Sequence, residues 1–517
     1  MLAVASAQAS LRRSVTPWGS YSWGYADVGA DIFVALGLVF GAAAGASNIA
    51  FLFAGLVYVC VGLAYTELAA AYPVAGGGQY FVMRGLGDLL GFTAGWAVLF
   101  DFTIDIALFA WACVGYLSNI LPALSATLHP ATHFALVLAL IVGLGILNVV
   151  GVRESTAFNG IVSALDVLSE TSILFFGFLF AFRPELLVHS MQVAWPTNFQ
   201  FMNGISLAII SFVGLESISQ AAEETHRPSA IIPRTSIALI LTILIFALAY
   251  SNLALGMQPW HSNAVAPGQM FWQSLGTAQN SDKAVAIIAS NIPYFGSLAA
   301  LYVPVLGAIL LLISSNSGVF GSSRIAYSMS QSQLLPGAFQ KVHPKFKTPA
   351  VSIITFTTLA AIVMCFAAAQ GDNGFNFLGD LYAFGAATSY SLVFIALIGL
   401  RLLDPLTPRK FKIPFNLPMM FRGMCVEFPI IGVLGFIGIF AILVFVLLTH
   451  PIGRIAGPAW VLAGVASYIV YRRHKRLPLF RSVKRDWIKE QTAILMAAGE
   501  LEQMDLYRDN VRKSKSL

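Results

Sequence analysis

The sequence predicts an all-α membrane protein with about twelve transmembrane helices, on the strength of three observations. Hydrophobic residues make up 57% of the 517 residues and charged residues only 10%, against about 25% charged in an ordinary soluble domain. Apolar runs recur along the whole chain at the length of about 20 residues that a membrane-spanning helix needs. The few basic residues gather in alternate connecting segments. A soluble fold of this size could not cover its surface with so few charges.

The apolar runs set the order of the spans. The first two turn near residues 45–48 within 31–67, and the others fall at 89–120, 134–151, 160–182, 203–222, within 235–281, within 292–323, and at 350–369, 381–400, 428–449 and 455–471. Most runs hold 18 or more apolar residues with few charges, which favours membrane spans over buried soluble helices.

The basic residues predict the orientation. With twelve spans and both termini in the cytoplasm, every Lys and Arg except Arg183, Lys283 and Arg454 falls on the cytoplasmic side. This asymmetry follows the positive-inside rule, and an odd number of spans would destroy it. We therefore expect a multi-pass protein of the cell membrane with both termini cytoplasmic.

The end of the chain, 472–517, differs from the rest in composition. Basic residues run from Arg472 to Arg485, and Trp487, Ile494 and Leu501 follow at near-helical spacing. Two interpretations remain open: an interfacial helix held by anionic lipid, or a solvated flank after the last span.

Seven carboxylates fall inside apolar runs that contain no Lys or Arg. They are Asp27 and Asp31 in span 1, Asp101 and Asp105 in span 3, Asp166 and Glu170 in span 5, and Glu216 in span 6. Each pair is spaced i,i+4, so its members share one helix face. An acid in such a place either stays protonated or holds a cation, which predicts proton or cation coupling. The alternatives are positions near a helix end in water, for Asp27, Asp166 and Glu170 above all, or a purely structural hydrogen bond.

Spans 1 and 6 share an internal match. Residues 28–31 read VGAD and residues 213–216 read VGLE, five spans apart. Glycine permits an unwound backbone, which frees N–H and C=O groups to bind a ligand. Glycine-interrupted helices in corresponding positions of two halves point to a midplane substrate site. Two flexible or tightly packed helices would be the alternative.

Several strings in order resemble the amino acid–polyamine–organocation (APC) superfamily. They are YTELAAAYP at 65–73, GGGQY at 76–80, GFTAGW at 91–96, FVGLE at 212–216, AEE at 222–224 with Pro228 and IPR at 232–234, SRIAYSM at 323–329, LP at 335–336 and VHPKFKTP at 342–349. The resemblance covers about residues 20–400. It implies a LeuT-type fold of two five-helix inverted repeats with helices 1 and 6 broken, and secondary transport by alternating access.

The resemblance also implies a division of the chain. The first repeat would occupy 26–182, the second 203–400 and two extra spans 427–471, between a cytoplasmic N-terminal segment, 1–25, and a basic cytoplasmic tail, 472–517.

The same resemblance assigns a substrate site. Val28, Gly29 and Ala30 match the unwound helix-1 segment whose amides usually hold a substrate carboxylate. Residues 212–216 match the helix-6 segment that usually faces the substrate amine and carries a gating or proton-linked glutamate, here Glu216. We expect Gly214 and Asp31 at this site as well.

Phe33 and Phe212 are candidate gates, although an aromatic side chain in a span more often serves packing.

The chain departs from the family pattern in three places. Asp31 stands where relatives commonly carry a small uncharged residue, and an ionised acid there would repel a substrate carboxylate. Either Asp31 is protonated when substrate arrives, or the substrate has no carboxylate. Residues 160–182 lack the lysine that some proton-coupled members carry on helix 5. Asp27 and Asp101 resemble acids of the potassium-importing branch, but Val34 replaces a tyrosine of that branch.

The sequence thus predicts a proton-coupled importer of an amino acid or small organic amine, with Asp27, Asp31, Asp101, Asp105, Asp166, Glu170 and Glu216 as candidate coupling acids. A potassium importer of the same fold is one alternative. A sodium-coupled symporter is another, since Ser314, Ser315 and Ser317 in span 8 offer hydroxyls near the family's sodium position. Helix packing would equally explain these serines.

Other classes of function find no support in the sequence. It has no His-rich metal cluster, no Ser/His/Asp set in a recognisable context and no phosphate-binding Gly-Lys loop. We expect no enzyme activity, cofactor or bound metal. The expected partners are a small-molecule substrate, a coupling ion and membrane lipid. Nucleic acid is not expected, because the basic residues follow membrane sidedness.

Overall fold

The computed structural model describes residues 16–74, 76–151, 156–222, 225, 227–260 and 268–516. In this part of the chain, eleven helical stretches are long and apolar enough to cross a membrane, and the first, Pro17–Ala71, contains two spans joined by a tight turn at Ala44–Ala46. The predicted all-α fold with about twelve spans is confirmed. Residues 1–15 of the predicted N-terminal segment, and Glu223 and Glu224 of the quoted strings, lie outside the described residues.

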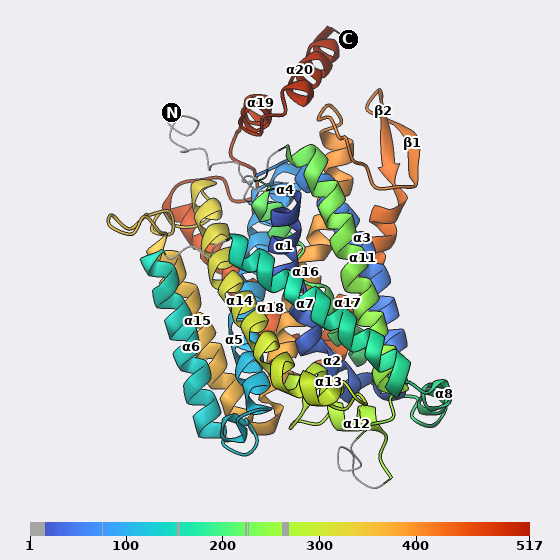
Figure 1. Cartoon of the computed structure of the whole chain (residues 1–517). Coiled ribbons are helices and arrows are strands. Elements are labelled where there is room, and N and C mark those ends of the chain that lie inside the picture. The colour runs from blue at the N-terminus through green and yellow to red at the C-terminus, as the bar shows by residue number, and fades with distance from the viewer. Residues whose placement is uncertain are drawn as a thin grey trace.

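The spans follow in chain order (Figure 1). They are α1 Pro17–Val28 with α2 Asp31–Ala43, α3 Ser47–Ala71, α5 Asp88–Ser118, α6 Pro130–Val150, α7 Thr156–Phe176, α9 Asn198–Ala208 with η4 Ile209–Phe212 and α10 Glu216–Ala221, α11 Pro228–Leu255, α14 Gly296–Gln331, α15 Ala350–Ala369, α16 Gly374–Leu403, α17 Ile430–Thr449 and α18 Gly453–His474. Shorter elements connect them: α4 Gly77–Leu86, α8 Pro184–Val193, α12 Phe271–Leu275, α13 Ala284–Ser290, the antiparallel hairpin β1 Asn416–Phe421 with β2 Met424–Pro429, and the tail helices α19 Trp487–Ala497 and α20 Leu501–Ser516.

Most spans lie within a few residues of their predicted positions, and the ninth matches at both ends. The largest difference is at the start, where helix α1 begins at Pro17, well before the apolar run at 31–67. Its polar residues Ser20, Ser22 and Asp27 are buried against other helices. Hydropathy therefore underestimates the length of a span whose polar face points into the protein.

Helix contacts reveal the inverted repeat. Helix α3 packs on α11, α5 on α14 and α6 on α15, and interrupted span 1 packs on interrupted span 6; Figure 1 shows α6 beside α15. The partners are five spans apart, so they run in opposite directions. Helix α7 packs on α1 and α14, whereas α16 packs on α9 and α5. Exchanging spans 1–5 with spans 6–10 thus leaves this contact pattern unchanged.

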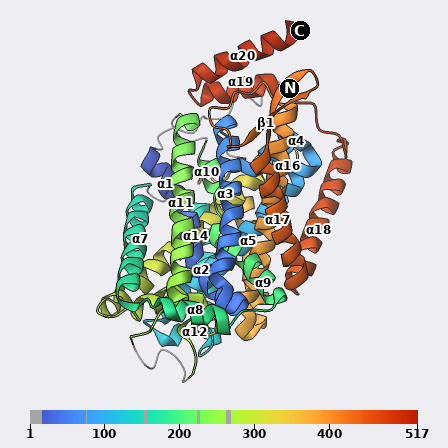
Figure 2. The ribbon, with the colours of Figure 1, turned by 90° about the vertical axis from the view of Figure 1, so that its right-hand side faces the viewer.

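The two ends of the helix bundle carry different elements. Helices α4, α19 and α20 and the β1–β2 hairpin lie at one end, which we call the tail face, and α8, α12 and α13 lie at the other (Figures 1 and 2).

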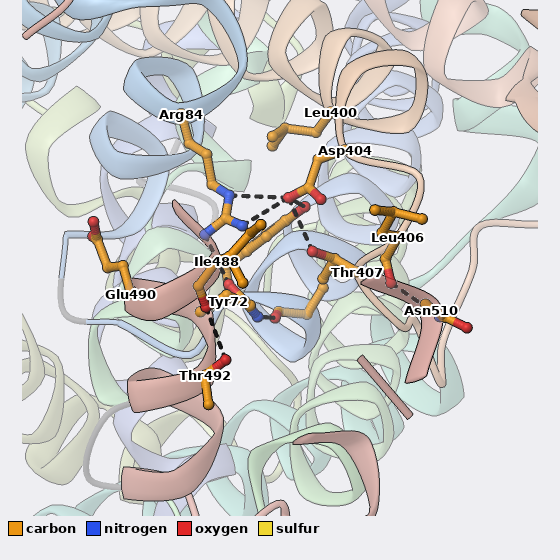
Figure 3. Close-up of polar contacts among 12 residues, drawn as sticks. Tyr72, Arg84, Leu400, Asp404, Leu406, Thr407, Ile488, Glu490, Thr492 and Asn510 are labelled. Carbon is orange, nitrogen blue, oxygen red and sulfur yellow. Dashed lines mark hydrogen bonds and ion pairs between the residues drawn. The ribbon is translucent and has the colours of Figure 1, made fainter. Parts of the chain in front are cut away.

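The tail is docked on the protein. The side chain of Gln491 in α19 is fully buried. Its amide nitrogen donates to the carbonyl oxygen of Ala71 at 3.0 Å, and its amide oxygen accepts from Arg84 Nη1 at 2.8 Å. Arg84 also binds Asp404 at 2.8 Å, beyond the end of α16 (Figure 3). Residue 491 therefore joins the ends of α3 and α4 to the tail.

Helix α20 has an apolar face of its own. Glu500, just before this helix, accepts a hydrogen bond from the backbone N–H of Ser229 at 3.0 Å. Four apolar side chains of the tail, Leu495, Met504, Tyr507 and Val511, pack together with Leu406, which lies just after α16. The apolar spacing in the tail thus serves contacts with the protein's own helix ends, an arrangement that neither interpretation of the sequence described.

A buried ion pair holds α3 to α16 near the tail face. Arg401 Nε and Nη2 donate to the two carboxylate oxygens of Glu67 at 2.5 and 2.7 Å, and both side chains are buried. The backbone N–H of Ile413 donates to Glu67 at 2.9 Å. Bidentate pairs of this kind are strong and geometrically specific.

Replacing Glu67 by Gln should lower the free energy of unfolding by about 3–5 kcal/mol, because the buried Arg401 guanidinium loses its bidentate counter-ion and keeps only the 3.4 Å ion pair with Glu427. Thermal unfolding of the purified protein in detergent measures the loss. Lys412→Gln is the control: its ammonium binds Glu427 at 2.8 Å with both side chains more than a third exposed, so its effect should stay within about 1 kcal/mol. Equal effects of both substitutions would contradict this account.

Candidate functional site

Span 6 is interrupted at Gly214. Helix η4 ends at Phe212, Val213 is extended with φ −87° and ψ 161°, and Gly214 has φ +101°. This φ favours glycine because a side chain is strained there. A Cβ at Gly214 would also lie 2.9 Å from Val28 Cγ2 and 3.1 Å from Asp27 Oδ2. The glycine therefore permits both the break and the close approach of span 1.

Span 1 is interrupted less than the resemblance implies. Helix α1 ends at Val28 and α2 begins at Asp31, but Gly29 and Ala30 keep right-handed helical backbone angles, φ −63° with ψ −31° and φ −70° with ψ −21°. The N–H of Gly29 still donates to the Tyr25 carbonyl at 2.7 Å. The α-helix is thus interrupted at Gly29 and Ala30, but the backbone of these two residues does not become extended.

The two interruptions lie side by side. Helix α1 contacts α10, and α2 contacts α9 and η4, so spans 1 and 6 cross in opposite directions at their midpoints. The hydroxyl of Ser217 in α10 donates to Asp27 Oδ2 across this crossing.

Five of the seven predicted acids gather around this crossing. Asp27, Asp31, Asp101, Asp105 and Glu216 are each at most 5% exposed and close enough to interact electrostatically. They come from α1, α2, α5 and α10, and we call them the acid cluster. Among the described residues, none of the five forms an ion pair with a basic side chain. For Asp27 the alternative of a helix end in water is wrong.

Tyr390 of α16 links the break in span 6 to the acid cluster. Its hydroxyl donates to Glu216 Oε2 at 2.9 Å and accepts from the N–H of Gly214 at 3.3 Å. Neither Tyr390 nor Ser217 was among the predicted site residues. Each lies in an apolar or weakly polar run. Only folding brings Tyr390 to Glu216, which is 174 residues away, and Ser217 to Asp27, which is 190 residues away.

Several carboxylate oxygens of the cluster have no hydrogen-bond partner within the described protein. They are Asp31 Oδ2, Asp101 Oδ1 and both oxygens of Asp105. A buried ionised carboxylate without a partner is too costly to persist. Such a cluster is chemically able to take up protons or a cation.

Two glycines bring neighbouring helices directly against the acids of α5. A Cβ at Gly385 of α16 would lie 3.0 Å from Asp101 Cα, and one at Gly318 of α14 would overlap Asp105 Oδ2. Asp101 and Asp105 are thereby enclosed between two bare helix surfaces.

The other two acids form a separate group. Asp166 and Glu170 of α7 are 0% and 1% exposed, so neither lies at a helix end in water. The hydroxyl of Tyr25 in α1 lies 2.8 Å from Asp166 Oδ2 and 3.0 Å from Glu170 Oε2. We call Asp166 and Glu170 the α7 pair.

The candidate gates both have packing partners. The Phe33 ring lies 5.4 Å from that of Tyr116, whose hydroxyl donates to the Phe33 carbonyl at 3.1 Å. Phe212 stacks on Tyr58 at 4.8 Å.

The three serines of α14 differ from one another. Ser315 donates to the Ile106 carbonyl at 2.9 Å, a helix-packing contact. Ser314 is fully buried and its hydroxyl has no partner within the described protein. Ser317 faces Asp27.

Comparison with known proteins identifies the family. A family model described as amino acid permease matches residues 19–470. The chain belongs to this family. It is therefore a membrane transporter for a small molecule and not an enzyme.

Similar proteins come from Bacillus subtilis (strain 168). A branched-chain amino acid permease is 26% identical over 497 residues, covering 92% of this chain and 97% of that protein. A methylthioribose transporter is 26% identical, covering 78% and 84%. A gamma-aminobutyric acid permease is 24% identical, covering 87% and 91%. Among solved structures, a manganese transporter of Eremococcus coleocola matches 89% of this chain and 94% of its own at 14% identity and a TM-score of 0.48, a likeness that decides nothing further.

Gly214→Ala should destabilise the permease by about 2–5 kcal/mol, since backbone strain of about 1–2 kcal/mol adds to overpacking against Asp27 and Val28. Gly371→Ala is the matched control: φ is +59° there, but nothing lies within 4 Å of the added Cβ, so only strain applies. Thermal unfolding of both variants measures the difference. Equal losses would mean that crowding at the helix crossing has no cost.

Proposed function

We propose that this permease imports an amino acid or small organic amine together with protons, by alternating access. The observation that carries this proposal is the acid cluster, which lies at the crossing of two interrupted helices and has no basic partner among the described residues. A substrate ammonium group and a transported proton are two ways to neutralise such a cluster.

An amine is the chemistry that the acid cluster favours. Carboxylates with free oxygens, such as Asp31 and Asp105, are strong acceptors for a charged N–H donor. Two of the relatives are named for amino acids, whereas the methylthioribose transporter shows that relatives at the same distance differ in substrate. The substrate class is therefore argued from the site, with the names as secondary support.

Asp31 carries its proton when a substrate with a carboxylate arrives. An ionised Asp31 beside a substrate carboxylate would be repelled strongly in this buried setting. Its neighbours in the cluster are four further acids, so accepting a proton also relieves repulsion inside the protein. A protonated Asp31 thereby lets the cluster accept a substrate that carries a carboxylate.

The loosened backbone near Gly29 and the break at Gly214 allow segments of spans 1 and 6 to move. Helix segments on either side of a break can tilt separately, which opens the site to one face at a time. The tail face lies in the cytoplasm of the cell, because nearly all basic residues outside the spans belong to segments at this end.

Uptake into proteoliposomes tests the proposed function. With one proton carried per substrate, an imposed gradient of one pH unit should give about tenfold accumulation of an amine or amino acid. The lack of gradient-driven accumulation for any compound of either class would contradict proton coupling. Asp31→Asn, which keeps the size and removes the charge, should weaken a cationic substrate by about tenfold or more. Unchanged uptake would remove Asp31 from the site.

An inorganic cation is the second candidate cargo. The unpartnered oxygens of Asp31, Asp101 and Asp105 are ligands of the type that hard cations prefer. Rescue of a potassium-uptake-deficient strain would favour potassium over an amine. Replacing sodium by choline in the uptake assay tests sodium coupling through Ser314 and Ser317.

A further inference from the structure

The Tyr25 hydroxyl contacts two carboxyl groups, although it has only one hydrogen to donate. Its oxygen lies 2.8 Å from Asp166 Oδ2 and 3.0 Å from Glu170 Oε2, both within hydrogen-bond range. A phenol carries one proton, so the two contacts either share it in a three-centre bond or include a hydrogen that a carboxyl group donates. Two ionised carboxylates around one shared proton would repel each other. The geometry therefore favours a proton on Asp166 or Glu170.

The surroundings of the α7 pair offer no other source of neutralisation. Within the described part of the chain, every titratable neighbour that faces the pair is a tyrosine: Tyr21 and Tyr25 on α1, Tyr116 on α5, Tyr250 on α11, and Tyr302, which accepts from Ser169, on α14. Asp166 Oδ1, Glu170 Oε1 and the fully buried Tyr250 hydroxyl have no hydrogen-bond partner there. Two ionised carboxylates enclosed by tyrosines would be prohibitively costly.

The α7 pair is also placed to sense movement of span 1. It lies away from both ends of the 21-residue helix α7. Tyr25 lies one helical turn before Gly29, whose N–H bonds to the Tyr25 carbonyl. A tilt of α1 about the loosened turn would withdraw the Tyr25 hydroxyl from both carboxyl groups. The pair would then exchange its proton with water that enters the gap.

We propose that Asp166 and Glu170, bridged by Tyr25, form the site that holds the coupling proton, separate from the substrate-binding acid cluster. This inference rests on the proposed function. The proton stays on the pair while α1 is docked against α7. When α1 tilts away, the proton passes from the carboxyl group to water, which leaves the pair one charge more negative.

Neutralising either acid tests the inference in the full-length protein. Wild type should accumulate substrate about tenfold per imposed pH unit, whereas Asp166→Asn and Glu170→Gln should only equilibrate it. Both variants should still exchange substrate for substrate, since the acid cluster is intact. Glu170→Asp should restore accumulation with an altered pH profile. Ser172→Ala removes a partly exposed hydroxyl that bonds within the same helix; it is the matched control and should accumulate like wild type.

The outcomes separate the two proposals. Wild-type accumulation with equal accumulation in both neutralised variants would overturn the α7 pair as the proton site. Failure of wild type itself to respond to the gradient would instead overturn proton coupling. Infrared difference spectra test the pair without transport: at neutral pH, at least one variant should lose a protonated-carboxyl band, and its retention in both would overturn the inference.

A second, independent observation concerns the tail face. Besides Gln491 on α3 and Glu500 on α11, Asn510 donates to the carbonyl of Leu406, just after α16, at 3.1 Å. The segment before α19 binds other helices: Arg485 donates to Asp88 of α5 at 2.5 Å and to the carbonyl of Ser332, just after α14, at 2.9 Å.

These contacts connect two groups of helices that must separate before a path to the acid cluster can open. The acid cluster lies between α1, α2 and α10 on one side and α5 on the other, and α1 and α10 pack on α11 and α3. A path from the tail face to the cluster requires these two groups of helices to part. The tail ties α5 and α14 to α3 and α11 across that gap. We propose that the docked tail is a latch that holds the tail face closed.

Amide hydrogen exchange in residues 25–31 and 214–219, which the tail does not touch, reports opening without a known substrate. Deleting residues 487–517 should speed this exchange severalfold, and Gln491→Leu should act in the same direction. Thr492→Ala is the control, because its exposed hydroxyl bonds only within α19. Unchanged exchange in both the shortened protein and Gln491→Leu would overturn the latch.

Discussion

The cost of removing carboxylates from water is the constraint on which this structure depends. Paired charges are kept near the tail face, where Glu67 binds Arg401 and Asp88 binds Arg472. In the interior, the acid cluster and the α7 pair are buried, and neither has a basic partner in the part of the chain that the structure describes. The side-chain donors to these acids are neutral hydroxyls of serine and tyrosine, which stabilise a carboxyl group without fixing its charge. The number of protons on these interior acids can therefore change when a substrate or an ion binds.

Helix α16 connects the two regions. From the middle of the protein to the tail face it carries Gly385 against Asp101, Tyr390 at the break in span 6, and Arg401 on Glu67. Asp404, just beyond its end, binds Arg84, which in turn holds Gln491 of the tail. The acid cluster and the docked tail therefore share one continuous mechanical element. A structural change at the acid cluster and one at the docked tail therefore both act on α16.

Much of this could be predicted from the sequence, for physical reasons. Span positions follow from uninterrupted apolar length, and the acids stood out because charge is rare in such runs. The Gly214 break followed from its repeat in span 1, but the same glycine signal overstated the break at Gly29, since glycine permits unwinding without requiring it. The separation of the α7 pair, the bridge by Tyr25 and the partners Tyr390 and Ser217 all depend on contacts between distant segments. In the tail, apolar spacing alone could not tell a lipid surface from the protein's own helix ends.

The bare surfaces at Gly318 and Gly385 have a consequence for how variation in this chain is interpreted. Neither glycine has a side chain that could bind a ligand, yet each sets how near α14 or α16 lies to an acid of α5. A library of random variants would show both codons depleted as strongly as those of the acids themselves. Intolerance to substitution at these two positions would reflect the close spacing of the helices and not a chemical role. A ranking of sites by mutational sensitivity alone would therefore count these two glycines among the ligand-binding residues.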